Sequence, residues 1–511
     1  MQLRIRHIAR NILFNWIGTI ASLAVGFFLS PFILHRLGDL AYGVWVLAVS
    51  VVGYLSLLDL GMQSSVLRYV SKGHTQGDHK GASEALSAAL WVRLRISAVV
   101  LVLSAVLAFF FPVFFKVPAA LAFDARWAVM LIGVSMSLTM SVGVAGGVLS
   151  GLNRYDLQNC VTLVQTALRV IGVVTVLKTG HGIVAIALCE LFANSVGLCM
   201  QVTIARRLYP QLSIYFQRPE RETLRKVWSY SAYAFLTTIA VQLVYQSDNL
   251  VVGAFVSASA VTFYAIANSL CRYSTQIVGS IGATFVPAAS TYEASGDMEG
   301  VRRLYVNGTR ATLIISMPIL ITFLVRGKQF IRLWMGPQYA HRSGDVLILL
   351  AIPLFFAYAN RTASAIAYGI EKHKLMAVAA IAEGVTNLVL SITLVHWYGI
   401  YGVALGTLIP SILVQLTFWP WYTSKLVDIS PMEVLWRVWG VMFLAAVPFA
   451  AVSYLFERFS APNHMATFFL QVLIAVGVFF LTIAAIFRNH VREVVLPRVQ
   501  SFLRPTLPVN Y

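Results

Sequence analysis

Several ionisable residues lie within long apolar stretches of this sequence. Arg169 is near the middle of one stretch, with Gln165 one helical turn before it, and Arg272 is near the middle of another. A charge at the bilayer centre costs about 2.5–3.5 kcal/mol on insertion scales, so such residues face a cavity or a partner. Arginine binds phosphate through a planar fork of N–H donors and stays ionised when desolvated. These residues predict a cationic site for a phosphate-bearing ligand.

A polar stripe supports the same prediction. Asn268, Arg272 and Gln276 recur at every fourth residue, which places them on one face of a helix that is otherwise apolar. Arg361, next to Asn360, lies about two turns from the end of a later stretch, so it can line a cavity or extend to the interface. We therefore expect Arg169, Arg272, Arg361, Asn268, Gln276 and Gln165 to bind substrate. The alternative for Arg169 and Arg272 is a structural ion pair with a buried carboxylate.

Arg93 and Arg95 occur in the first turns of a third apolar stretch. They are candidates for the cytoplasmic entrance of the cavity. The alternative is that both extend to the interface and contact lipid phosphate.

Buried carboxylates are few. Glu190 and Glu383 each lie about eight residues into an apolar stretch, and Asp248 lies near the end of another. A carboxylate in a medium of low dielectric constant can take up and release a proton, so these three are candidates for ion coupling. They can equally compensate the charge of Arg169 or Arg272, and Asp248 can be a cap or turn residue.

No sequence motif indicates a cofactor, a metal or an enzyme. A GxxxxGK(S/T) loop and an HExxH motif are both absent, and the ten histidines are scattered. The four cysteines lie in apolar stretches and form no CxxC pair, which is typical of free buried thiols.

The apolar stretches that hold these residues predict an all-α polytopic membrane protein. The chain is 59% hydrophobic and only 11% charged, and about 20 apolar residues suffice to cross the hydrocarbon. We expect about 14 transmembrane helices. Their ranges are 12–34, 40–60, 86–114, 125–149, 157–177, 182–204, 227–252, 258–290, 306–325, 345–369, 375–397, 399–424, 432–455 and 464–487.

Lysine and arginine counts predict the orientation. With the N-terminus inside, the inside segments hold 23 of these residues and the outside segments hold 9. This favours both termini in the cytoplasm. The loop 326–342 is the exception, because it is basic although it is assigned outside, and we expect an amphipathic surface segment there. The net charge of +18 is explained by topology and anionic lipid, so nucleic acid is not an expected partner.

An internal repeat organises the chain. Leu37–Asp78 and Val256–Asp297 align without a gap, and both end in Gly-Asp, 219 residues apart. The stretches at Gly151 and Gly369, and at Gly182 and Gly402, repeat at nearly the same spacing, which indicates a duplication. Parallel membrane repeats are a transporter architecture with the substrate site between the halves. The predicted division is a six-helix bundle at 1–204, a basic cytoplasmic linker at 205–226, a second bundle at 227–424, two further helices at 425–487 and a cytoplasmic tail at 488–511.

Short motifs along nearly the whole chain resemble the bacterial oligosaccharide and polysaccharide flippases, which belong to the multidrug/oligosaccharidyl-lipid/polysaccharide exporter superfamily. The motifs are LGDLAYGVWVL, YLSLLDLGMQSSVLRYVS, GLNRYDL, QSDNLVVGAF, TFYAIANSL and FVPAAS. The resemblance implies two pseudo-symmetric six-helix bundles in a V shape plus two C-terminal helices. It also implies transport of undecaprenyl-diphosphate-linked oligosaccharides across the bacterial inner membrane for O-antigen, capsule or exopolysaccharide synthesis, with membrane lipids, a polysaccharide polymerase and other assembly proteins as partners.

Four alternatives remain open. The first is a lipid II-type or teichoic-type flippase, and the second is a cation-coupled multidrug exporter, whose cavity would be rich in carboxylates rather than arginine. A membrane glycosyltransferase or polymerase would need larger polar loops than 61–85 and 205–226 provide. A duplicated scaffold without transport is the fourth.

Overall fold

The computed structural model describes residues 2–59, 62–213, 242 and 246–487. Within these residues every regular element is a helix. Eleven helices or helical segments are long and apolar enough to cross a membrane, which confirms the all-α, multi-pass class. The exact number of fourteen spans stays a prediction, because most of the span expected at 227–252, like most of the linker at 205–226, lies outside the described residues.

The chain divides into two compact units, which we describe separately. Unit 1 comprises 1–266 and 376–407, and unit 2 comprises 267–375 and 408–511. The predicted division into two bundles, a linker, an extra helix pair and a tail stays a prediction.

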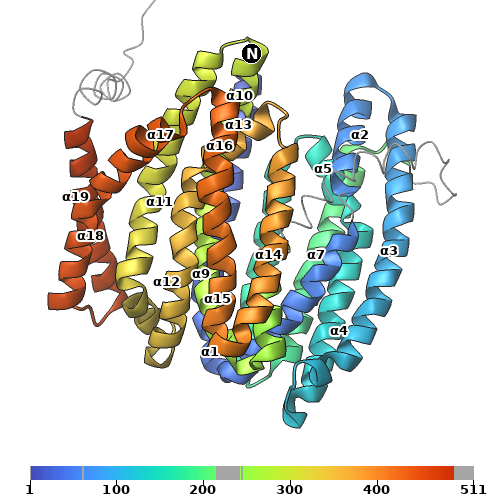
Figure 1. The fold of residues 1–511 in the computed structure, drawn as a ribbon. Helices are drawn as coiled ribbons and strands as arrows, with labels where there is room; N and C mark the ends of the chain where they lie inside the picture. Colours follow the sequence, from blue (N-terminus) through green and yellow to red (C-terminus); the bar gives the residue numbers. More distant parts are fainter. Residues whose placement is uncertain (1, 60–61, 214–241, 243–245, 488–511) are drawn as a thin grey trace, which may run out of the picture. The chain divides into compact units, whose positions relative to one another are not determined.

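In unit 1, α3 packs along α4 (Figure 1), and α6 packs against both α7 and α1, while α7 also packs against α4. The helix α1 carries two of the expected spans and bends at Gly38, where φ is 76°. Residues 246–255 form a further helical segment. The helices of unit 1 are α1 (Gln2–Tyr54), a 3-10 helix (Leu55–Asp59), α2 (Met62–Gln76), α3 (His79–Phe114), α4 (Ala119–Val142), α5 (Val144–Gly151), α6 (Tyr155–Lys178), α7 (Ile183–Leu208), most of α14 (Lys374–Tyr398) and parts of α9 and α15.

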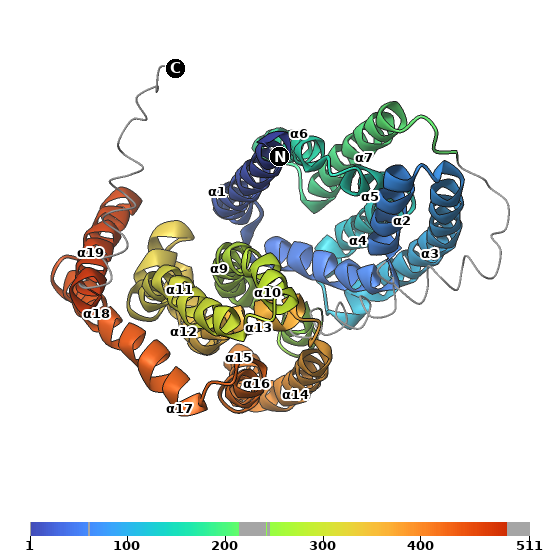
Figure 2. The ribbon, with the colours of Figure 1, turned by 90° about the horizontal axis from the view of Figure 1, so that it is seen from above.

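In unit 2, α11 packs along α12 and α18, and α18 packs along α19 (Figure 2). The helices of this unit are α9 (Ala258–Gly282, from residue 267), α10 (Phe285–Ala294), α11 (Met298–Trp334), a 3-10 helix (Pro337–Tyr339), α12 (Ala340–Ala359), α13 (Arg361–Gly369), α15 (Ile400–Leu413, from residue 408), a π-helix (Val414–Phe418), α16 (Trp419–Val427), α17 (Pro431–Glu433), a π-helix (Val434–Gly440), α18 (Val441–Phe459) and α19 (Met465–Ile486).

The expected surface segment at 326–342 is wrong in its first part. Residues 326–334 continue α11, and Arg326 is fully buried. The helix continues through this arginine because Glu457 lies 3.4 Å from its Nε atom and Gln471 accepts a hydrogen bond from Nη2 at 2.5 Å. The positive charge of Arg326 is therefore not evidence of a loop at this position.

The repeat seen in the sequence is present in the local geometry of the two units. Asp78 caps α3 by accepting from the backbone N–H of Gly81 at 2.8 Å, and Asp297 caps α11 by accepting from Gly300 at 2.7 Å. The glycine before each cap is left-handed, with φ of 72° at Gly77 and 69° at Gly296. Glycine adopts this conformation without the steric cost of a Cβ, so the Gly-Asp pair starts an equivalent helix in each unit.

Helix packing repeats as well. In unit 1 the end of α5 lies against α2, where a Cβ on Gly151 would be 3.0 Å from the backbone oxygen of Leu67. In unit 2 the end of α13 lies against α10, where a Cβ on Gly369 would be 2.7 Å from the backbone oxygen of Val286. Gly151 and Gly369 are separated by nearly the same number of residues as the capping residues Asp78 and Asp297. Each unit therefore contains the same helix–helix contact.

Candidate functional site

The polar face of α9 in unit 2 carries the strongest predicted binding residues. Arg272 and Gln276 are exposed on this face, and Asn268, one turn earlier, is half-buried. The guanidinium of Arg361, from the start of α13, reaches the next turn, since its Nη2 atom would lie 3.2 Å from a Cβ on Gly279. Positions 272, 276 and 279 share one helical face. Arg272, Gln276 and the guanidinium of Arg361 therefore lie along one face of α9.

A break between α12 and α13 positions Arg361. Asn360 occupies the break, is buried, and donates from Nδ2 to the backbone oxygen and to Oε1 of Gln415, at 3.1 and 3.0 Å. Arg361 then lies flat along α9 over Gly282, where a Cβ would be 2.9 Å from its Cγ atom. A larger residue at position 282 would displace the arginine.

The charge on this α9 face is not compensated by ion pairs. Among the described residues neither Arg272 nor Arg361 forms a salt bridge, whereas Arg93, Arg154, Arg169 and Arg326 each do. Two exposed guanidinium groups with open N–H donors suit an anionic ligand with several oxygens, such as a diphosphate.

Arg169 is paired instead. Its Nε atom lies 2.7 Å from Oε2 of Glu190 on α7, and the two side chains are 42% and 28% exposed. One turn away, Gln165 contacts Asn194, which donates to the Ser135 hydroxyl at 2.9 Å. These residues form a polar layer across α6, α7 and α4. The alternative of charge compensation thus holds for Arg169 and Glu190.

We expect this ion pair to contribute about 1 kcal/mol to the free energy of unfolding. The contribution is small because both groups are partly exposed to solvent. The single changes Arg169→Gln and Glu190→Gln should each lower the free energy of unfolding. The double change should cost less than the sum of the two. A double-mutant cycle that uses unfolding in detergent measures the difference. Strictly additive losses of unfolding free energy would contradict a stabilising interaction between the two side chains.

Asp248 lies in a second polar cluster of unit 1. The hydroxyls of Tyr264 and Thr407 donate to its Oδ2 atom at 2.6 and 2.9 Å, and Asn387 donates to Thr407 at 2.9 Å. Asp248 is only 4% exposed, and among the described residues no cation pairs with it and nothing bonds its Oδ1 atom.

The alternative of a cap or turn at Asp248 is wrong, because the helical segment continues to Phe255. Glu383, the remaining carboxylate candidate, is half-buried on α14, one turn before Asn387. Asp248 is thus a buried carboxylate that has no charged partner among the described residues.

The two entrance candidates differ from each other. Arg95 is exposed and lies over the ring of Trp91, with its Cζ atom 3.2 Å from the ring centroid. Arg93 is only 4% exposed, and its Nη2 atom lies 2.7 Å from Oδ1 of Asp59. Arg93 therefore pairs with Asp59 inside unit 1 and does not extend to the interface, as the alternative supposed.

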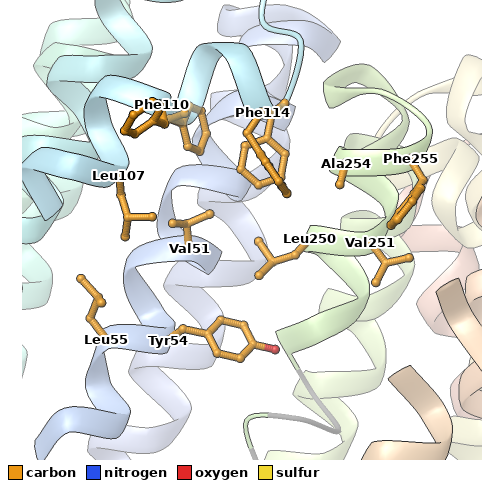
Figure 3. Close-up of a pocket in the computed structure, with 12 residues that line it drawn as sticks. Val51, Tyr54, Leu55, Leu107, Phe110, Phe114, Leu250, Val251, Ala254 and Phe255 are labelled. Carbon is orange, nitrogen blue, oxygen red and sulfur yellow. The ribbon is translucent and has the colours of Figure 1, made fainter. Parts of the chain in front are cut away.

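An apolar pocket of about 470 Å³ opens in unit 1 between α1, α3 and the segment 246–255 (Figure 3). Phe110 and Phe114 lie at one end, and Leu55 and Tyr54 at the other. The Tyr54 hydroxyl donates to the backbone oxygen of Gln242 at 3.3 Å. With no charged residue in its lining, the pocket suits a hydrocarbon and not a phosphate.

Sequence reasoning missed several members of these clusters. Gly279 and Gly282 follow the polar stripe of α9. Two glycines this close together in a helix could have indicated that a side chain from another helix packs there. Asn194, Tyr264 and Thr407 carry no such signal, because their partners come from other helices.

Comparison with known proteins identifies relatives along most of the chain. A family profile described as "Polysaccharide biosynthesis protein" matches residues 33–344, which is more than half of the chain. An "Uncharacterized membrane protein EpsK" of Bacillus subtilis (strain 168) is 25% identical over 469 residues, covering 89% of this chain and 91% of that protein. A "Putative O-antigen transporter" of Shigella flexneri is 22% identical over 394 residues, covering 77% and 92%.

Solved structures show a similar fold. A structure of the lipid II flippase MurJ, in an inward closed conformation, has a TM-score of 0.70 at 18% identity and covers 94% of this chain and all of that one. An inward-facing multidrug resistance MATE transporter of the MOP superfamily has a TM-score of 0.66 at 15% identity, covering 80% and 95%. The flippase resemblance of the sequence motifs is thus confirmed, and the chain is a multi-pass membrane protein that belongs to the polysaccharide biosynthesis protein family and has the fold of these transporters.

Proposed function

We propose that this protein is a flippase for undecaprenyl-diphosphate-linked oligosaccharide units. It moves them from the cytoplasmic to the periplasmic leaflet of the bacterial inner membrane during the synthesis of surface polysaccharide. Both termini lie in the cytoplasm in this proposal, which the lysine and arginine distribution supports. Transport proceeds by alternating access, in which the binding residues are exposed to one side of the membrane and then to the other.

The observation that carries the proposal is the uncompensated cationic face of α9. Arg272 and Arg361 offer planar forks of donors to a diphosphate, and Gln276 between them can bond a sugar or phosphate oxygen. Arg169, which pairs with Glu190, is a further candidate that we predicted from the sequence. This positive charge would repel the substrates of an organic-cation exporter.

Asp248 is the proposed coupling group. Burying a carboxylate without a counter-charge is costly, and protonation removes that cost. When the cluster opens to water, the proton can leave. Uptake on one side and release on the other would couple transport to a proton gradient, while Tyr264 and Thr407 hold the carboxyl in place.

The test is flipping of a fluorescent undecaprenyl-diphosphate oligosaccharide in proteoliposomes. We expect the wild-type protein to flip it, and Arg272→Gln to lower the rate at least about tenfold, because one charge-assisted hydrogen bond contributes about 1.5–3 kcal/mol. Arg272→Lys should retain part of the activity, since lysine keeps the charge but loses the fork.

The matched control is Arg332→Gln, an exposed arginine at the end of α11 that forms no ion pair among the described residues. It should flip the lipid at the wild-type rate. Export of organic cations by a wild-type protein that leaves the lipid in place would refute the proposal. A preference for fluorescent lipid II would move the substrate assignment to the lipid II class.

A further inference from the structure

The helix α11 is longer than a membrane is thick. Its 37 residues span about 55 Å, against about 30 Å of hydrocarbon. The stretch 311–325 contains no charge, and Arg310 and Arg326 stand at its two ends. The polar turns from Met298 to Arg310 therefore lie at the edge of the hydrocarbon and beyond it, at the depth of lipid headgroups.

A pocket of about 410 Å³ opens beside these turns, within unit 2. We call it the α11 pocket. One wall is the first three turns of α11, and the other is the segment around α17. Its lining combines three arginines, two glutamates, one amide and three aliphatic side chains: Glu299, Arg302, Arg303, Val306, Asn307, Arg310, Ile429, Glu433 and Val438.

The ion pairs of Arg302 and Arg303 are long. Nη2 of Arg302 lies 3.7 Å from Oε2 of Glu433, and Nη2 of Arg303 lies 3.7 Å from Oδ2 of Asp297. A charge-assisted N–H···O bond is normally 2.7–2.9 Å long, so these contacts leave guanidinium donors open to a ligand. Arg302 and Arg303 thus lie close to carboxylates that do not saturate their donors.

Side chains near the opening are of the kind found at a membrane surface. Trp436, on the segment that follows α17, is 70% exposed, and Met432 is 61% exposed. The indole Nε1 of Trp436 lies 3.0 Å from the Met432 sulfur. Exposed tryptophan next to basic residues is typical of the headgroup layer of a bilayer. A ligand of the α11 pocket therefore comes from the membrane.

We propose that the α11 pocket binds the phosphoethanolamine headgroup of a membrane phospholipid. Arg302, Arg303 and Arg310 bond the phosphate, and the carboxylates of Glu299 and Glu433 accept from the primary ammonium. Because the lining contains both arginines and glutamates, it favours a headgroup that carries both a positive and a negative charge. A purely anionic headgroup would meet the two carboxylates, and a choline headgroup has no N–H to donate to them.

The experiment titrates the delipidated, purified full-length protein with dioleoyl phosphatidylethanolamine, phosphatidylcholine or phosphatidylglycerol and measures bound lipid by native mass spectrometry. We expect phosphatidylethanolamine to bind about tenfold more tightly than either of the others. The double change Arg302→Gln/Arg303→Gln should weaken it about tenfold. Glu433→Gln should remove the preference over phosphatidylcholine. Arg332→Gln, at the other end of α11, should change nothing.

Three results would overturn the proposal. The first is equal binding of all three lipids, and the second is tighter binding of phosphatidylglycerol. The third is displacement of phosphatidylethanolamine by undecaprenyl diphosphate or by inorganic phosphate at equal concentration, since this would make the pocket a general phosphate site. The readout is lipid binding and not transport, so the inference stands or falls independently of the flippase proposal. Arg303, which is 64% exposed, can be changed alone if the double variant does not fold.

Discussion

Replacing Asp248 by asparagine is expected to abolish the response of transport to a proton gradient. In wild-type proteoliposomes, one pH unit supplies about 1.4 kcal/mol per proton, which is about a tenfold ratio between the leaflet distributions of the lipid with and without the gradient if one proton is coupled. In Asp248→Asn this ratio should fall to about one, because the amide cannot exchange a proton. The measurement is the leaflet distribution of the fluorescent lipid without the gradient and with it imposed in each direction.

The surroundings of Asp248 supply the controls. Thr407→Val removes one of its two hydroxyl donors and leaves the carboxyl, so coupling should persist at an altered rate. Glu190→Gln changes a carboxylate that is already paired with Arg169, so the gradient response should be retained. An undiminished gradient response in Asp248→Asn would assign coupling elsewhere, and loss of the response in Glu190→Gln would assign it to the Arg169 pair.

Arg326→Ala is expected to have the largest effect on stability. The side chain is fully buried, donates to Gln471, contacts Glu457, and lies with its Cζ atom 4.6 Å from the ring centroid of Phe468. It thereby joins α11 to α18 and α19. Removing one partner of a buried charge pair costs about 3–5 kcal/mol. We expect about 2–3 kcal/mol here, because Glu457 is 29% exposed.

The measurement is unfolding in SDS followed by tryptophan fluorescence, with Arg332→Ala on the same helix as the matched control. The double change Arg326→Met/Glu457→Leu should recover much of the loss, because apolar side chains of similar size replace a buried ion pair at little cost. Equal unfolding free energies for Arg326→Ala and Arg332→Ala would show that the buried contacts contribute nothing.

Local features of the sequence determined much of the fold. Apolar runs longer than the hydrocarbon thickness predicted a multi-pass helical protein, because each run must satisfy its own backbone hydrogen bonds. The repeated Gly-Asp pairs at Gly77 and Gly296 indicated a duplication, and each pair starts an equivalent helix, since a left-handed glycine and a capping carboxylate act within a few residues. The same locality explains how the stripe from Asn268 to Gln276 could be predicted.

Only the tertiary structure decided which charges are neutralised. Arg326 and Glu457 are 131 residues apart, and Asp248 and Thr407 are 159 apart, so no spacing in the sequence predicts these contacts. Arg169, Arg93 and Arg272 look alike in the sequence, yet packing places Glu190 and Asp59 beside the first two and no ion-pair partner among the described residues beside the third. The cost of a charge in an apolar region depends on what lies within a few ångströms of it, and helix packing sets that distance.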